Sequence, residues 1–155
     1  MKPLKTQFMK KLSIVAIIAL TVISSSFANG PAAPHFKGVE NFTRTFPQAT
    51  VVNYQVKGRY TEVNFTWNNM TLEAFFDQDG ELIGTTRNIA VEDLPLSLIM
   101  TLKSKYAGFR ATEAIEFNQA ESGLSYYVTV TNTEKTYLLH ITPDGIIDVF
   151  KKMKN

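Results

Sequence analysis

The oxygen-rich segment from Asp77 to Glu81, Asp-Gln-Asp-Gly-Glu, is the part of the sequence that comes nearest to a metal-binding loop. Calcium requires oxygen ligands at alternating positions around a glycine, and this segment has carboxylates on both sides of Gly80. A second turn of the same kind, from Thr142 to Ile146, keeps the Asp-Gly pair but lacks the other carboxylates. The segment is therefore predicted to be a hairpin turn, and no metal is predicted.

Other reactive side chains are dispersed along the chain. The two histidines, His35 and His140, lack the neighbours at short spacing that a zinc site needs. The adjacent Glu92 and Asp93 fit a helix start better than a glycosidase pair, which needs two acids across a cleft. No glycine-rich phosphate loop follows a strand. None of the serines beyond residue 28 lies in a Gly-x-Ser-x-Gly elbow: Ser97, Ser104, Ser122 and Ser125. The sequence therefore predicts no catalytic residue, no cofactor and no enzyme activity.

The charge of the chain is concentrated at its beginning. The 155 residues carry a formal charge of +2, but four of the 16 basic residues and none of the 14 acidic ones fall in residues 1–28. The remainder has a net charge of −2, with its basic residues dispersed. This distribution argues against nucleic-acid binding.

The first 28 residues have the pattern of a secretory signal peptide. Lysines precede an apolar run from Leu12 to Ile23, and Ser26 and Ala28 are the small residues of a cleavage site before Asn29. The alternative is a membrane anchor, but the run is shorter than the roughly 20 apolar residues that a spanning helix needs. The absence of cysteine excludes a disulfide framework and a lipid-modified cysteine. We expect a protein exported to the periplasm or the medium, without stable membrane insertion of the mature chain.

The mature chain is predicted to contain a flexible lead-in, residues 29–37, and one domain, residues 38–155, that repeats itself. Val39, Phe42 and Phe46 have helical spacing, and so do the residues 60 positions later, Ile99, Leu102 and Tyr106. The run Ala74, Phe76, Asp79, Gly80, Leu82 returns 65 positions later as Leu139, Ile141, Asp144, Gly145, Ile147. This ordered pair of matches predicts two repeats, residues 38–90 and 91–150.

Each repeat is predicted to be a helix followed by four short strands. Alternating apolar residues and turn pairs such as Asn68-Asn69 and Asp79-Gly80 divide the strands. The fold class is therefore predicted to be α+β, with two helices packed on one face of an antiparallel sheet of about eight strands and the other face left to solvent. The predicted helices end near Phe46 and Tyr106, and the predicted strands are 51–56, 60–67, 70–76, 81–86, 112–118, 124–131, 135–141 and 146–150.

Four segments of this pattern resemble a known family. They are the run from Phe46 to Ala49, the run from Ala74 to Gly80, the Asp93-Leu94-Pro95 start of the second helix, and the closing Asp144-Gly145. Together they resemble the PepSY-like group of exported bacterial proteins, which is also described as resembling a beta-lactamase inhibitor. The resemblance implies a duplicated helix-plus-four-strand fold and a non-catalytic binding or inhibitory role. It carries over no catalytic residue.

Strand alternation predicts which side chains face away from the helices. If Val63, Phe65 and Trp67 face the core, the residues between them face outward. Aromatic residues set among polar ones are typical of interfaces, although cross-strand aromatic pairs also stabilise sheets that bind nothing. The predicted partner-binding residues are Tyr60, Glu62, Asn64, Glu73, Phe75, Tyr127, Thr129 and His140.

The leading hypothesis is an exported, non-enzymatic binding module, inhibitor-like in character, that presents this sheet face to a protein or peptide. The alternative is an envelope or matrix protein with a structural role or a small-molecule cargo. A sizeable cavity under the helices would favour cargo. No motif specifies the partner or the oligomeric state.

Overall fold

Consecutive segments of the chain pair with each other throughout the structure. The computed structural model describes residues 35–154, so the predicted signal peptide and residues 29–34 lie outside the described part. Every strand pairs antiparallel with the next one in sequence, which gives one eight-stranded sheet in the order β1 to β8. The strands are β1 (Thr50–Lys57), β2 (Tyr60–Trp67), β3 (Met70–Asp77), β4 (Leu82–Ile89), β5 (Arg110–Gln119), β6 (Gly123–Thr131), β7 (Lys135–Ile141) and β8 (Ile147–Lys154).

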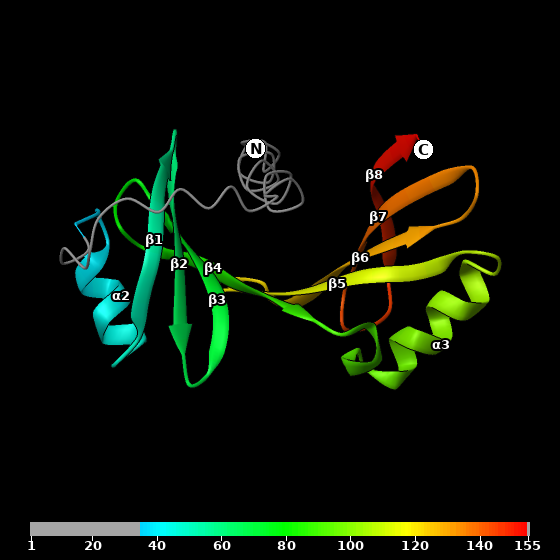
Figure 1. Ribbon diagram of the computed structural model, residues 1–155, viewed down its shortest axis with the longest axis horizontal. Helices are drawn as coiled ribbons and strands as arrows, with labels where there is room; N and C mark the ends of the chain where they lie inside the picture. The colour runs from blue at the N-terminus through cyan, green and yellow to red at the C-terminus, as the bar shows by residue number, and fades with distance from the viewer. Residues whose placement is uncertain (1–34, 155) are drawn as a thin grey trace, which may run out of the picture. The chain divides into compact units, whose positions relative to one another are not determined.

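Two α-helices precede the two groups of four strands. Helix α2 (Val39–Thr45) comes before β1, and α3 (Leu96–Lys105) comes before β5 after a short 3-10 helix, η1 (Val91–Asp93). Pro95 precedes the first residue of α3, where its fixed φ suits a helix start. Figure 1 shows α2 beside the first strands of the sheet and α3 beside the later ones. The predicted combination of two helices and about eight antiparallel strands is confirmed.

Each helix covers its own apolar cluster. Phe42 of α2 and Phe46 just after it pack with Val63, Phe65 and other residues of β2 and β3. This cluster is rich in phenylalanine, whereas the cluster under α3 is mainly aliphatic. The buried members of the cluster under α3 are Leu94, Leu98, Leu102, Ala114, Tyr126, Val128, Val130, Leu139 and Ile141.

The strand register places both clusters on the same face of the sheet. Val63 pairs with Ala74, and Ala74 pairs with Thr85. Thr85 pairs in turn with Asn118, and Asn118 with Leu124, which packs against the α3 cluster. Directly paired residues share a face. The prediction that both helices lie on one face is therefore confirmed.

Phe36 belongs to the α2 cluster although it falls in the predicted lead-in. Its ring lies 6.0 Å from that of Phe42 and 5.7 Å from that of Phe76. The side chain is buried. The packed part of the chain therefore includes a residue before Gly38, where the domain was predicted to begin.

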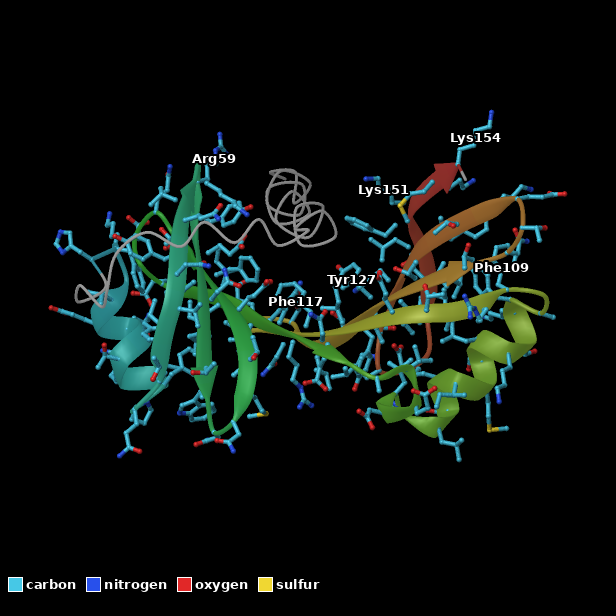
Figure 2. The ribbon with its side chains drawn as sticks, viewed as in Figure 1. Arg59, Phe109, Phe117, Tyr127, Lys151 and Lys154 are labelled. Carbon is cyan, nitrogen blue, oxygen red and sulfur yellow. The ribbon has the colours of Figure 1, made fainter. Side chains whose placement is uncertain are left out.

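The structure corrects two sequence-based expectations. Strand β8 continues through the lysines to Lys154, because Lys135 to Leu138 of β7 still provide pairing partners there. Figure 2 shows Lys151 and Lys154 along this last strand. The face away from the helices was expected to be left to solvent, but several of its central side chains are buried, including Tyr60, Glu62 and Phe75.

Candidate functional site

A row of aromatic side chains crosses the sheet on the face opposite the helices, which we call the helix-free face. The ring of Phe75 lies 6.0 Å from that of Tyr60 and 6.4 Å from that of Phe117. Phe117 lies 6.3 Å from Tyr127, and Tyr127 stacks on His140 at 4.9 Å. Figure 2 shows Phe117 and Tyr127 on neighbouring strands at the middle of the sheet. The row therefore runs from β2 in the first half of the chain to β7 in the second.

Gly84 makes the centre of this row possible. It is the partner of Phe75 in β3, and a Cβ at this position would lie 2.8 Å from a ring carbon of Phe117 and 2.7 Å from the carbonyl oxygen of Asn118. Contacts this short would displace the ring or the backbone. The missing side chain therefore leaves the space in which the Phe117 ring approaches Phe75.

Two carboxylates lie beside the aromatic row in the first half. The Nζ atom of Lys57 forms a 2.6 Å ion pair with the carboxylate of Glu62, and the side chain of Glu62 is only 4% exposed. Glu73 accepts a 3.1 Å hydrogen bond from the hydroxyl of Thr86. Burial, and then the neighbouring charge of Glu62, raise the pKa of Glu73 above its ordinary value, against the opposing effects of Thr86 and Lys57.

Two buried hydroxyl groups on this face have no hydrogen-bond partner within the described structure. They are the Oη atom of Tyr60 and the Oγ atom of Ser125. Burial and the charge of Glu62 raise the pKa of Tyr60 to about 12, so this hydroxyl is protonated at neutral pH and can donate a hydrogen bond. Unsatisfied buried polar groups are costly, and each calls for an explanation.

The second half of the row contains the half-buried His140. Its ring stacks on Tyr127 and its strand partner is Asp148 in β8. Burial lowers the pKa of His140, against a smaller opposing effect of Asp148, and burial also raises the pKa of Tyr127. Both side chains are therefore uncharged at neutral pH.

The register brings all eight predicted site residues onto the helix-free face. Glu62 pairs with Phe75, and Asn64 pairs with Glu73. Tyr127 pairs with His140 in the second half. Asn64 donates a 2.9 Å hydrogen bond to Asn53, and Thr129 donates one of 3.2 Å to Glu113.

Three further residues of this face were not predicted from the sequence: Phe117, Lys57 and Thr86. The ring of Phe117 lies between those of Phe75 and Tyr127, and Lys57 donates a hydrogen bond to Glu62. Alternation within 112–118 would have placed Phe117 beside Ile115, but it does not say which face the pair occupies.

The Asp77 segment has the geometry of a turn. The Oδ1 atom of Asp77 accepts hydrogen bonds from the backbone N–H groups of Asp79, at 2.8 Å, and Glu81, at 2.9 Å. Gly80 has a φ of +84°, which an L side chain rarely adopts. Within residues 35–154, no group of three or more histidine, aspartate or glutamate side chains is arranged to hold a metal ion.

A small cleft lies on the other face, beside the end of α3. It has a volume of about 260 Å³. Its walls include Leu102 and Tyr106 of the helix region and Phe109 before β5, and Figure 2 shows Phe109 beside the helix. Lys103 and Arg110 also line it. It is slightly smaller than typical ligand pockets, which begin at roughly 300 Å³.

Several solved structures share this fold. A BLIP-like protein from Bacteroides fragilis superposes with a TM-score of 0.68 at 19% sequence identity, covering 81% of this chain and 91% of that one. A DUF2874 family protein from Bacteroides uniformis gives a TM-score of 0.67 at 15% identity, covering 81% and 90%. A candidate periplasmic protein from Bacteroides eggerthii gives 0.65 at 14% identity, covering 80% and 90%.

These likenesses show a BLIP-like fold. No protein-family model matches the chain, and no curated protein matches it. The predicted resemblance to an inhibitor-like fold is supported in this way, while membership of the PepSY-like group stays a prediction. Among the described residues, no helix combines the length and the apolar character needed to cross a membrane.

Proposed function

We propose that this protein is an exported, non-enzymatic binding module, inhibitor-like in character, that recognises a protein or peptide through the helix-free face. The observation that carries the proposal is the aromatic row from Tyr60 to His140, which is continuous across both halves and lies beside buried polar groups that lack partners. Rigid aromatic side chains with nearby polar groups are common at the centres of interfaces. The BLIP-like fold of the compared structures supports the same class of protein.

The proposed binding surface consists of the eight predicted residues together with Phe117 and Thr86. Asn64, Glu73, Thr129 and His140 are partly exposed, so they are available for direct contact. The buried aromatic rings would support these contacts from beneath. Export is supported by the lysine-rich and apolar beginning of the sequence and by the comparison with a candidate periplasmic protein.

Capture of a partner by surface-charge variants tests this proposal. Truncating Tyr60 or Phe75 to alanine would damage folding because both are buried, so the variants should alter partly exposed positions instead. Asn64→Arg and Thr129→Arg add a long charged side chain to the helix-free face. Ser104→Arg makes the same change on the exposed side of α3 and serves as the control.

The tagged exported protein is used to capture partners from the envelope and the medium of the producing cell. We expect the Ser104→Arg control to retain the same partner as the wild type, while each face variant loses at least about 90% of it, as expected when a charge enters an interface core. Melting temperatures measured by circular dichroism check that the variants fold. Equal capture by folded face variants would refute the proposed surface.

We also propose that the two halves arose by duplication. Helix-side residues match at an offset of 65: Val63 with Val128, and Ala74 with Leu139, all of them buried. The glycines of the Asp-Gly turns, Gly80 and Gly145, have the same φ of +84°. Tracing the same offset in sequences of related proteins would test the proposal, since a duplication requires that the two halves align to each other better than to shuffled sequences.

A second candidate function is binding of a small amphiphilic anion in the cleft beside α3. The apolar walls would contact a short hydrocarbon chain, and the cations Lys103 and Arg110 would contact its carboxylate. Octanoate titrated against the labelled protein should then shift the NMR signals of Tyr106 and Phe109, and Arg110→Gln should weaken this response. Identical responses to octanoate and octanol would refute the role of the cations.

A further inference from the structure

The first half of the helix-free face holds two carboxylates, those of the buried Glu62 and the partly exposed Glu73, and Lys57 forms an ion pair with Glu62. Glu62 and Glu73 lie on adjacent strands and are diagonal neighbours, because Glu62 pairs with Phe75 and Asn64 pairs with Glu73. Lys57 is the cation paired with Glu62. Glu73 has a hydroxyl partner, Thr86, but no ion pair within the described residues. Ionisation of both carboxylates therefore leaves one uncompensated charge.

The third component of this site is the unpartnered hydroxyl of Tyr60. Tyr60 is 95% buried, since only 5% of its surface is exposed, and its Oη atom has no hydrogen-bond partner within the described structure. The charge of Glu62 contributes to the raised pKa of Tyr60, and the ring of Tyr60 packs against that of Phe75. We define the acidic site as the carboxylates of Glu62 and Glu73 together with Tyr60, which lies beside Glu62 on the same face of β2. The surrounding aromatic rings add an environment that favours cations.

The opposite end of the helix-free face differs in charge. Positions 65 residues later are Tyr127 in place of Glu62 and Leu138 in place of Glu73. The carboxylates on the second half of this face, Glu113 and Asp148, are exposed, so the buried and partly buried carboxylates of this face lie over β2 and β3 alone among the described strands. The positively charged part of a bound partner is therefore expected to lie over β2 and β3.

We propose that the acidic site receives a basic side chain of the protein or peptide partner, with the planar guanidinium group of an arginine as the best match. This inference rests on the proposed function, because it assigns a chemistry to one end of the same face. The guanidinium would donate to the partly exposed carboxylate of Glu73 and lie near Glu62. Paired charge-assisted hydrogen bonds to carboxylates are a particular capacity of arginine. A bound cation also stabilises the ionised form of Glu73.

The structure favours arginine over a neutral or acidic side chain for a physical reason. A neutral side chain leaves the second carboxylate uncompensated in a partly buried location, and an acidic one adds repulsion. A metal ion is a poorer match, since within residues 35–154 no third histidine, aspartate or glutamate joins the pair. The site therefore favours an organic cation, such as an arginine side chain of a peptide, over a metal ion.

Three matched peptides test the inference. The probes are Ac-Ser-Phe-Xaa-Tyr-Ser-NH₂, in which Xaa is arginine, its neutral isostere citrulline, or glutamate. Each is titrated at pH 7 into the isotope-labelled exported protein, and binding is followed by NMR signals of Tyr60, Glu73, Phe117 and Tyr127. We expect the arginine peptide to bind about tenfold more tightly than the citrulline peptide, as for one added charge-assisted hydrogen-bonded pair, and the glutamate peptide to bind most weakly.

Variants connect the preference to the site. Glu73→Gln should remove most of the difference between the arginine and citrulline peptides. The control is Glu113→Gln, which makes the same change at an exposed glutamate that accepts a hydrogen bond from Thr129, away from the acidic site. This control should retain the preference.

The possible results separate the two proposals. Equal binding of the arginine and citrulline peptides, with signals of the helix-free face shifting in both cases, would overturn the arginine inference and leave the proposed function standing. An arginine preference that survives Glu73→Gln would also overturn it. If no peptide shifts any signal of this face, the proposed binding surface and the inference both fail.

Discussion

The two halves of the sheet agree on one face and differ on the other. On the helix side, four pairs of residues separated by 65 positions are apolar and buried: Val63 and Val128, Phe65 and Val130, Ala74 and Leu139, Phe76 and Ile141. On the helix-free side, the same offset joins residues of different chemistry: Tyr60 and Ser125, Glu62 and Tyr127, Asn64 and Thr129, Glu73 and Leu138, Phe75 and His140.

This difference separates what the fold requires from what it leaves free. The helix side excludes water under α2 and α3, so side chains that are mostly apolar and of suitable volume fill these two clusters. On the helix-free side, the first half holds the buried Glu62 and the partly exposed Glu73, whereas the carboxylates of the second half, Glu113 and Asp148, are exposed. We infer that chemical specificity of the protein is located on the side where the halves differ.

The largest expected effect concerns the helix-side pair Phe76 and Ile141. Both are fully buried and lie 65 positions apart, so Phe76→Ala should reduce the free energy of unfolding by about 3–5 kcal/mol and Ile141→Ala by about 2–5 kcal/mol. Urea denaturation followed by circular dichroism measures the loss. A loss below about 0.5 kcal/mol, the usual limit for a surface substitution, at either position would contradict a packed core on that side of the sheet.

A smaller loss is expected for Lys57→Met, which leaves Glu62 buried without its cation. The ion pair is 2.6 Å long, but Lys57 is 23% exposed, so we expect a loss of about 2–3 kcal/mol, below the value for a fully buried pair. The double variant Lys57→Met, Glu62→Leu should recover most of it. The second half has Tyr127 in the position of Glu62, so it has no corresponding sensitivity. An additive loss in the double variant would disprove the coupling.

Acidification should affect the two halves in opposite directions. The raised pKa of Glu73 contributes stability that is present below its ordinary value of 4.5 and is lost as the pH rises through the folded-state value. The lowered pKa of His140 contributes stability that is present above 6.5 and is lost as the pH falls through the folded-state value. Unfolding free energies measured from pH 4 to pH 8 for Glu73→Gln and His140→Gln should differ from wild type with opposite pH slopes. Slopes of the same sign would contradict the proposed environments.

The smallest effect is expected at the equivalent positions Tyr60 and Ser125. Each hydroxyl is buried without a partner in the described structure, so Tyr60→Phe and Ser125→Ala should be neutral or stabilising by up to about 1 kcal/mol. Thermal unfolding measures the change in stability. A marked destabilisation by either change would reveal a hydrogen-bond partner of that hydroxyl and contradict the prediction.

Much of the fold could be predicted from local patterns. Turn pairs and strict alternation located β2 and β7 at their observed bounds. The extent of β8 was underestimated because a run of lysines is a weak strand signal, whereas pairing with β7 maintains the strand. Tertiary pairing therefore corrected what local composition could not specify.

The site was predictable in part. Alternation in β2 and β3 identified the face that holds Glu62 and Glu73. In β5, the apolar character of Ile115 and Phe117 would place them on the helix side, but both face away from the helices. The charged Glu116 lies on the helix side instead, where it forms an ion pair of 2.7 Å with Arg87. The burial of the helix-free face depends on a ring from the second half lying over Gly84 of the first, which no local pattern contains.

The strand order also has a consequence for how the chain reaches its native state. Because every strand pairs with its immediate neighbour in sequence, most contacts close short loops and cost little chain entropy. The pairs formed by β1 to β4 require no residue beyond Ile89, so this half can assemble before the rest of the chain is present. The aromatic row, with Phe117 against Phe75, needs the second half, as do the β4–β5 pairing and the Arg87–Glu116 ion pair. The acidic site can therefore form early, but the complete binding face is assembled last.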